Sequence, residues 1–104
     1  MKATYGFRAT MTAKPGKGDE LVDLLLSGPT EGPAADDACV VFLVTRSTSN
    51  PDVVHLVEGW ASEEAHQKVF ESEAAKAYTA RFGPLLDGES QYGDEVPVGG
   101  KANL

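Results

Sequence analysis

The chain has 104 residues and a mass of 11.0 kDa, which predicts a single domain with one hydrophobic core. Hydrophobic residues make up 41% and charged residues 24% of the sequence, so a disordered or fibrous class is excluded. The formal net charge of −7 argues against nucleic acids and anionic membranes as partners, because both require a cationic surface. No apolar run approaches the ~18 residues of a membrane span, and no secretory core follows the start of the sequence. The single cysteine, Cys39, excludes an internal disulfide, and we expect a cytoplasmic location.

The first half of the chain predicts three strands and one helix. Apolar and polar residues alternate over residues 3–12, as in a half-buried strand. A break at residues 14–18 precedes a helix that begins near Asp19 and ends at Gly28-Pro29, and residues 28–37 are expected to be loop. Two further strands are predicted over residues 38–46 and 53–61, and the short turn between them indicates an antiparallel hairpin.

The second half predicts a broken helical region and a last strand. Ser62 is expected to cap a helix that runs to about Phe70, and a second helix begins near Ser72. Helical spacing places one inward stripe on this second helix: Ala74, Ala77, Tyr78, Arg81, Phe82 and Leu85. Residues 89–98 complete the strands, and the Gly-rich tail over residues 99–104 is expected to be flexible.

The order β-α-β-β-α-β predicts an α+β, ferredoxin-like domain over residues 1–98. Its four-stranded antiparallel sheet would carry the helices on one face only. The strand over residues 38–46 is nevertheless apolar on both faces, with Val40, Phe42 and Val44 opposite Cys39, Val41 and Leu43. We therefore expect a second copy of the sheet to cover the other face in a homodimer. The alternative is that the chain's own tail or long loop covers it.

Two segments resemble the antibiotic biosynthesis monooxygenase family. They are Lys14-Pro15-Gly16-Lys17 before an acidic helix start, and the stretch from Val57 to His66, which contains Glu58-Gly59-Trp60. The resemblance implies a dimeric α+β barrel and, in many members, cofactor-free oxidation of quinols or anthrones by O₂. It also includes haem-degrading enzymes, but their first-strand Asn is absent here and Phe70 stands where they carry a His. The haem-degrading branch is therefore disfavoured.

Four residues are candidates for handling protons and charge, namely His66, Tyr5, Tyr78 and Arg81. His66 matches a His position of the family, and an imidazole titrates near neutral pH; a packing or surface role is the alternative. Tyr5 could hydrogen-bond a substrate oxygen. Arg81, among apolar neighbours, needs an anion, which could be a phenolate or, as the slightly favoured alternative, Glu58.

Aromatic residues are expected to form the wall of a cavity between the helices and the sheet. Trp60 could stack on a planar ligand or serve only as core, and the other wall candidates are Phe7, Phe82 and Phe42. The sequence contains no GxGxxG, CxxC or HExxH motif, and His55 and His66 make a poor metal site, so neither a cofactor nor a metal is expected. The resulting hypothesis is a cofactor-independent monooxygenase that oxidises a small aromatic substrate with O₂. The alternative is a non-catalytic dimer that binds a small aromatic or hydrophobic molecule.

Overall fold

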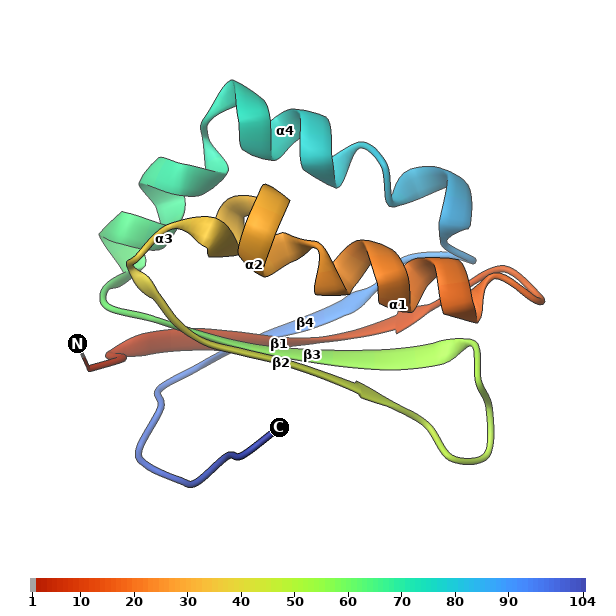
Figure 1. The fold of residues 1–104 in the computed structure, drawn as a ribbon, viewed down its shortest axis with the longest axis horizontal. Helices are drawn as coiled ribbons and strands as arrows, with labels where there is room; N and C mark the ends of the chain where they lie inside the picture. The colour runs from red at the N-terminus through yellow and green to blue at the C-terminus, as the bar shows by residue number, and fades with distance from the viewer. Residues whose placement is uncertain (1) are drawn as a thin grey trace.

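A computed structural model describes residues 2–104, so Met1 of the predicted domain lies outside it. Its four strands form one antiparallel sheet in the order β2-β3-β1-β4 (Figure 1). The strands are shorter than predicted by up to a few residues at their ends: β1 is Tyr5–Thr12, β2 Cys39–Arg46, β3 Val53–Trp60 and β4 Gln91–Glu95. This order and the element sequence confirm the ferredoxin-like α+β fold.

All helices lie on one face of the sheet, as Figure 1 shows. The α-helices are α1 (Gly18–Leu26), α2 (Gly28–Glu31), α3 (Glu63–Phe70) and α4 (Glu73–Thr79), and two 3₁₀ turns span Pro33–Ala35 and Gly83–Leu85. The expectation that residues 28–37 form only loop is wrong, because α2 and the first 3₁₀ turn lie there. Pro29 and Pro33 stand in the first turn of these elements, where a missing N–H costs no hydrogen bond.

A serine cap begins each of α3 and α4, and the second cap, Ser72, fixes the break between the two helices. The Ser62 hydroxyl accepts a hydrogen bond from the Ala65 N–H, and the Ser72 hydroxyl accepts one from the Ala75 N–H, both at 3.1 Å. Each serine has extended backbone dihedral angles, so it ends the preceding segment and begins the next helix. The broken helical region is therefore confirmed, with Ser62 as the predicted cap.

The core lies between the helices and the inner face of the sheet. Alternate residues of β3, Val54, Leu56 and Trp60, are buried there, while His55 and Val57 point to the opposite face. Residues of β1 and α1 complete the cluster: Phe7, Ala9, Met11, Leu21 and Leu25. Such alternation places one side chain of every two in the core.

The predicted inward stripe of the second helix is only partly right. Tyr78 is buried, but Ala74, Ala77 and Arg81 are exposed, and Ala75 is buried instead. Arg81 lies beyond the end of α4 at Thr79, so the helical spacing used for the prediction does not continue to it. Within α4 the buried face carries Ala75 and Tyr78, so Ala74 and Ala77 fall outside it. A stripe extrapolated beyond the end of its helix loses its register.

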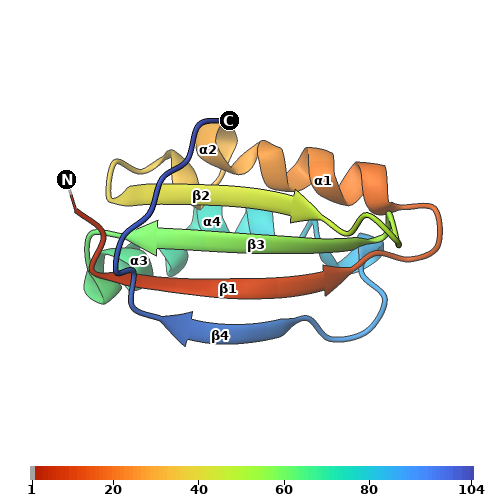
Figure 2. The ribbon, with the colours of Figure 1, turned by 90° about the horizontal axis from the view of Figure 1, so that it is seen from below.

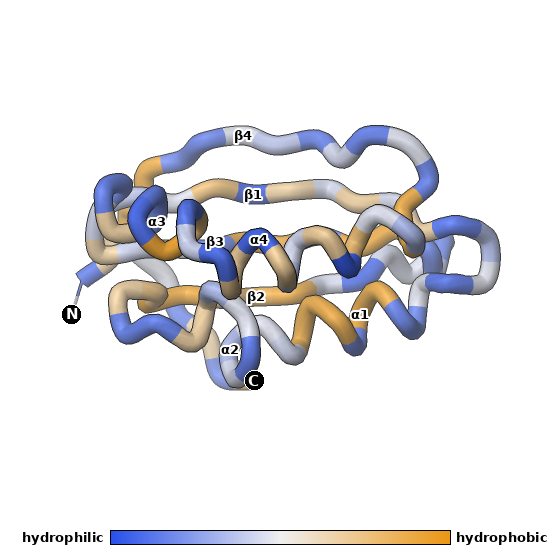
Figure 3. Tube along the Cα trace, turned by 90° about the horizontal axis from the view of Figure 1, so that it is seen from above, coloured by the Kyte–Doolittle hydropathy of each residue, from blue (hydrophilic) through white to orange (hydrophobic). Residues whose placement is uncertain are grey.

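The other face of the sheet carries apolar side chains with partial exposure. Val41 on β2 is 40% exposed and Val57 on β3 is 37% exposed, and Leu43 pairs with Val57 between neighbouring strands. Figure 3 shows that the strand β2 is hydrophobic along most of its length, whereas β4 is hydrophilic. We call this surface the open face, and its apolar half lies on β2 and β3.

A β-bulge in β2 changes the predicted alternation at its start. Cys39 pairs with Trp60 and Val41 pairs with Gly59, so Val40 is the extra residue. Two residues that are two apart in β2 therefore pair with neighbours in β3. The prediction that Cys39 shares a face with Val41 and Leu43 is wrong for this reason.

The C-terminal segment after β4 crosses the open face near one end of the sheet (Figure 2). Pro97 lies against Gly6 there, but Val98 and Leu104 are almost fully exposed. The segment therefore does not bury the apolar half of the open face. Within residues 2–104, none of the helices has the length and apolar character needed to cross a membrane.

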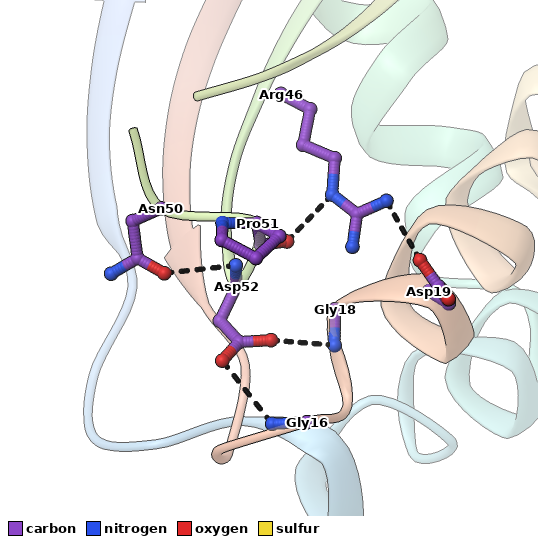
Figure 4. Close-up of polar contacts among 7 residues, drawn as sticks. All are labelled: Gly16, Gly18, Asp19, Arg46, Asn50, Pro51 and Asp52. Carbon is purple, nitrogen blue, oxygen red and sulfur yellow. Dashed lines mark hydrogen bonds and ion pairs between the residues drawn. The ribbon is translucent and has the colours of Figure 1, made fainter. Parts of the chain in front are cut away.

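A cluster of polar contacts holds the β2–β3 hairpin to the start of α1 (Figure 4). The Asp52 carboxylate accepts hydrogen bonds from the N–H groups of Gly18, at 2.9 Å, and Gly16, at 3.2 Å. Arg46 donates to the Pro51 carbonyl at 2.6 Å and pairs with Asp19 at 2.8 Å. Asp52 thus supplies, from a distant loop, the negative charge that a helix N-terminus favours.

Candidate functional site

Two adjoining cavities lie between the helices and the inner face of the sheet. The outer cavity has a volume of about 330 Å³ and is lined by Tyr5, Phe7, His66, Phe70, Tyr92 and Asp94. The inner cavity has about 70 Å³, and it shares Phe7, Phe70 and Tyr92 with the outer one. The outer cavity falls in the range of small-molecule sites, roughly 300–1,000 Å³. It is not sealed, because Tyr92 at its edge is 67% exposed.

His66 of α3 stands at the wall of the outer cavity inside a group of aromatic rings. The ring centroids of Tyr5, Phe7, Trp60 and Phe70 lie 5.5, 5.2, 5.1 and 4.9 Å from that of the imidazole. These rings come from β1, β3 and α3, so the fold brings together positions that are far apart in the sequence. Their apolar surroundings lower the pKa of His66, because burial disfavours the charged imidazolium.

The Nε2 atom of His66 is buried and has no hydrogen-bond partner among residues 2–104. Buried polar atoms in folded proteins almost always have a partner, so an isolated one at a cavity wall requires an explanation. A neutral imidazole presents either an acceptor or a donor at this position, according to its tautomer. His66 therefore has an unmet hydrogen bond, which a polar group of a ligand could satisfy.

Glu58 of β3 lies at the inner cavity and is only 8% exposed. Its Oε1 accepts a hydrogen bond from the Trp60 indole N–H at 2.8 Å, and no residue among 2–104 donates to Oε2. Burial raises the pKa of Glu58 to about 7, and the bond from Trp60 opposes this rise. A carboxyl group that titrates near neutral pH can exchange protons under physiological conditions.

Tyr5 lies at the mouth of the outer cavity, as expected of a residue on the inner face of β1. Its hydroxyl donates a hydrogen bond to Asp94 of β4 at 3.1 Å. Burial, followed by the contact with Asp94, raises the pKa of Tyr5 to about 12. Tyr5 therefore stays protonated at neutral pH and acts as a hydrogen-bond donor rather than as a base.

Tyr78 lies inward as predicted, whereas Arg81 does not. The Tyr78 hydroxyl donates to the Leu24 carbonyl, so it links α4 to α1 while its ring lines the inner cavity. Arg81 is exposed, stands outside both cavities, and pairs with Glu31 at 3.9 Å. The predicted ion pair between Arg81 and Glu58 is therefore wrong.

The predicted aromatic wall is present in large part. Phe7, Phe42 and Phe82 all line the inner cavity, and Phe7 lines the outer one as well. Trp60 is fully buried and lines neither cavity directly; it holds the Glu58 carboxyl and packs on His66. Trp60 therefore influences the cavities by positioning the Glu58 carboxyl group and the His66 ring.

Two features of the site were missed or underestimated from the sequence. Glu58 was considered only as an ion-pair partner, although its spacing from Val54, Leu56 and Trp60 on β3 already indicated a carboxyl on the buried face. Phe70 and Tyr92 are further wall residues, and only the packing of α3 and β4 over β1 reveals them. In the part of the chain that the structure describes, no three His, Cys, Asp or Glu side chains gather as a metal ion requires.

Fold and cavity together define a small ferredoxin-like α+β domain with an aromatic-lined site between sheet and helices. The family model of antibiotic biosynthesis monooxygenases matches residues 4–81, and the chain belongs to this family. A search of curated proteins gave no match.

Solved structures with the same fold include two candidate antibiotic biosynthesis monooxygenases. That of Chloroflexus aurantiacus J-10-fl has a TM-score of 0.81 and 27% identity, covering 96% of this chain and 98% of its own. That of Caulobacter crescentus CB15 has a TM-score of 0.76 and 25% identity, covering 94% and 92%. A Mycobacterium tuberculosis protein shares the fold with a TM-score of 0.78 at 21% identity, covering 96% and 100%.

Proposed function

We propose that the protein is a cofactor-independent monooxygenase that oxidises a quinol or a polycyclic hydroxyaromatic compound with O₂. The observation that carries this proposal is the buried, unpartnered Nε2 of His66 at the wall of an aromatic-lined cavity of about 330 Å³. The neutral imidazole accepts a proton from the substrate hydroxyl, and the surrounding rings hold a planar substrate. Family membership supports the same reaction class.

The chemistry requires the substrate itself to supply the electrons. An anthrone methylene reacts with O₂ to give a ketone and water, which is a monooxygenation. A quinol reacts with O₂ to give a quinone and hydrogen peroxide, so with this substrate the same proton removal would give an oxidase reaction. Transfer of the proton to His66 produces an electron-rich anion beside the imidazolium that balances its charge, and this anion reacts with triplet O₂ more readily than the neutral compound does. The protein then has to bind the substrate, accept its proton and hold its rings in place.

A second candidate is a non-catalytic protein that binds a small aromatic molecule in the same cavity. The observation in its favour is the opening of the outer cavity at the exposed Tyr92, where a bound molecule would stay in contact with solvent. Ligand binding without enzyme-dependent oxygen uptake would favour this candidate. Fold alone does not decide between the two.

We also propose that the chain forms a homodimer through the open face. The partly exposed Val41 and Val57, with Leu43, form an apolar surface on β2 and β3 that the C-terminal segment leaves bare. Contiguous apolar surface of this kind marks interaction sites on proteins. A two-fold axis would set the same strands against one another, and each subunit would keep its own cavity on the helix side.

Replacement of His66 by Gln is expected to lower the turnover of a menadiol-type quinol by about 100-fold or more, because general base catalysis contributes roughly 10²–10⁴-fold. Quinone formation is followed by absorbance in air and under nitrogen, with enzyme-free reactions subtracted. Wild-type protein should accelerate the reaction in air and show no turnover without O₂.

The matched control is His55→Gln, which removes the other imidazole of the chain. His55 lies on the opposite face of the sheet, where Nδ1 bonds Thr10 at 3.1 Å, so its variant should keep wild-type turnover. Equal rates in air with and without wild-type protein would refute the oxygenase proposal, and equal rates for His66→Gln and wild type would refute the role of His66.

A further inference from the structure

We propose that Glu58 selects the charge of the ligand: the cavity accepts an uncharged hydroxyaromatic, whose hydroxyl donates a hydrogen bond to Glu58 Oε2, and it rejects the same ring system bearing a carboxylate. This inference rests on the proposed function for the place where the ligand binds. It assigns a specificity role to a residue that the sequence offered only as an ion-pair partner of Arg81.

The position of Glu58 makes one oxygen available to a ligand. Its side chain lines the inner cavity together with Phe7 and Phe42, two of the aromatic walls. The Trp60 indole fixes Oε1 at 2.8 Å and thereby sets the orientation of the carboxyl group. With Oε2 lacking a donor among residues 2–104, the hydroxyl of a ligand can supply the missing hydrogen bond.

The two cavities contain no cation that could balance a negatively charged ligand. Among the residues that line them, the ionisable side chains other than tyrosine are Glu58, Asp94 and His66, and none is Lys or Arg. Arg81, which the sequence suggested as an anion partner, lies outside. An anion that enters would be desolvated beside a buried carboxyl group, which costs several kcal/mol without a compensating partner.

The ionisation of Glu58 makes this selectivity depend on pH. Three titratable groups interact electrostatically with Glu58, namely Cys39 on β2, Tyr5 on β1 and Tyr78 on α4. His66 on α3 lines the adjoining cavity. The thiol and phenol groups have raised pKa values and stay neutral, and burial lowers the pKa of His66, which favours its neutral imidazole. Because the pKa of Glu58 is about 7, the carboxylate forms and rejects anions more strongly as the pH rises through this value.

The test compares 2-naphthol with 2-naphthoate, which share one ring system and differ in charge. Isothermal titration calorimetry at about pH 8 is expected to show that wild-type protein binds 2-naphthol at least about tenfold more tightly, as expected for a hydrogen bond to a charged group. In Glu58→Gln, the amide oxygen can still accept from Trp60, and the amide NH₂ then faces the cavity. This variant should bind 2-naphthoate more tightly and 2-naphthol more weakly, so that the ratio of the two affinities falls by about tenfold or more.

The matched control is Glu64→Gln, which changes net charge equally at an exposed position of α3 and should keep the wild-type ratio. An unchanged ratio in folded Glu58→Gln would overturn the role of Glu58. A second measurement needs no variant: the wild-type ratio should be several-fold larger at about pH 8 than at about pH 6, and a constant ratio would equally overturn the inference.

These outcomes separate the inference from the proposed function. Binding of both ligands with equal affinity would remove the role of Glu58 and leave the oxygenase proposal standing. If neither ligand binds, both the inference and the proposed use of the cavity are overturned. Selective binding of 2-naphthol, together with equal rates of quinol oxidation in air with and without the protein, would support Glu58 and refute the oxygenase proposal.

Discussion

Val57→Glu is expected to separate the proposed dimer into monomers. The side chain of Val57 lies on the open face, next to Leu43 of the neighbouring strand, and is 37% exposed in the isolated chain. In a dimer with two-fold symmetry the substitution would bury two carboxylates in an apolar interface, at a cost of several kcal/mol. That cost corresponds to a dissociation constant higher by about 10³-fold or more.

Light scattering at micromolar concentration measures this effect directly. Wild-type protein should give twice the chain mass of 11.0 kDa, and Val57→Glu should give the mass of one chain. Leu26→Glu is the matched control, since Leu26 is an apolar residue of α1, 56% exposed, on the opposite side of the sheet. A wild-type particle with the mass of one chain would refute the proposed dimer.

Gly18→Ala is expected to destabilise the fold by about 2–4 kcal/mol. A Cβ atom at this position would collide with the Pro51 carbonyl oxygen and would lie 2.6 Å from Arg46 Nη2 and 2.8 Å from Asp52 Oδ1. The hairpin loop would have to move away from α1, and the hydrogen bond from the Gly18 N–H to Asp52 would be lost or lengthened. For a domain of this size, the midpoint of thermal unfolding should fall by roughly 10–20 °C.

Gly83→Ala supplies the control for this substitution. A Cβ at Gly83 would meet no atom within 4 Å, so its unfolding midpoint should stay close to that of the wild type. Thermal unfolding followed by circular dichroism measures both variants. If Gly18→Ala unfolds at the same temperature as Gly83→Ala, the close contact between the hairpin and α1 does not contribute to stability as described.

Much of the fold could be predicted because local signals and the periodicity of apolar residues agree. Alternation defines β1, the β-prone runs on either side of a short turn define β2 and β3, and the Ser62 cap sets the start of α3. The errors arise where a local signal has two physical meanings. Gly28-Pro29 ends α1 but also begins α2, because proline suits the first turn of a helix as well as a break.

Long-range pairing explains the remaining differences in the fold. The bulge at Val40 depends on how β2 pairs with β3, and the sequence of β2 alone carries no mark of it. Arg81 was placed inward because helical spacing was extended beyond Thr79, where α4 in fact ends. The end of a short helix is determined by its packing as much as by its own residues.

The candidate site could be predicted in residue type but not in arrangement. His66, Tyr5 and Phe7 do line one cavity, as the hypothesis required. The absence of a hydrogen-bond partner for His66 Nε2 among residues 2–104 depends on contacts between three elements, so no local pattern reveals it. Glu58 could have been recognised as buried from its place on β3, but its raised pKa depends on the burial produced by the whole fold.

We propose above all that the protein oxidises an aromatic substrate with O₂ in its cavity. Isotope labelling tests this proposal most directly. Anthrone is incubated with the protein under ¹⁸O₂, and the product is analysed by mass spectrometry beside an enzyme-free reaction. We predict enzyme-dependent formation of anthraquinone that carries one ¹⁸O atom, with the rate strongly reduced in His66→Gln. Formation of labelled product at the same rate with and without the protein would contradict the claim.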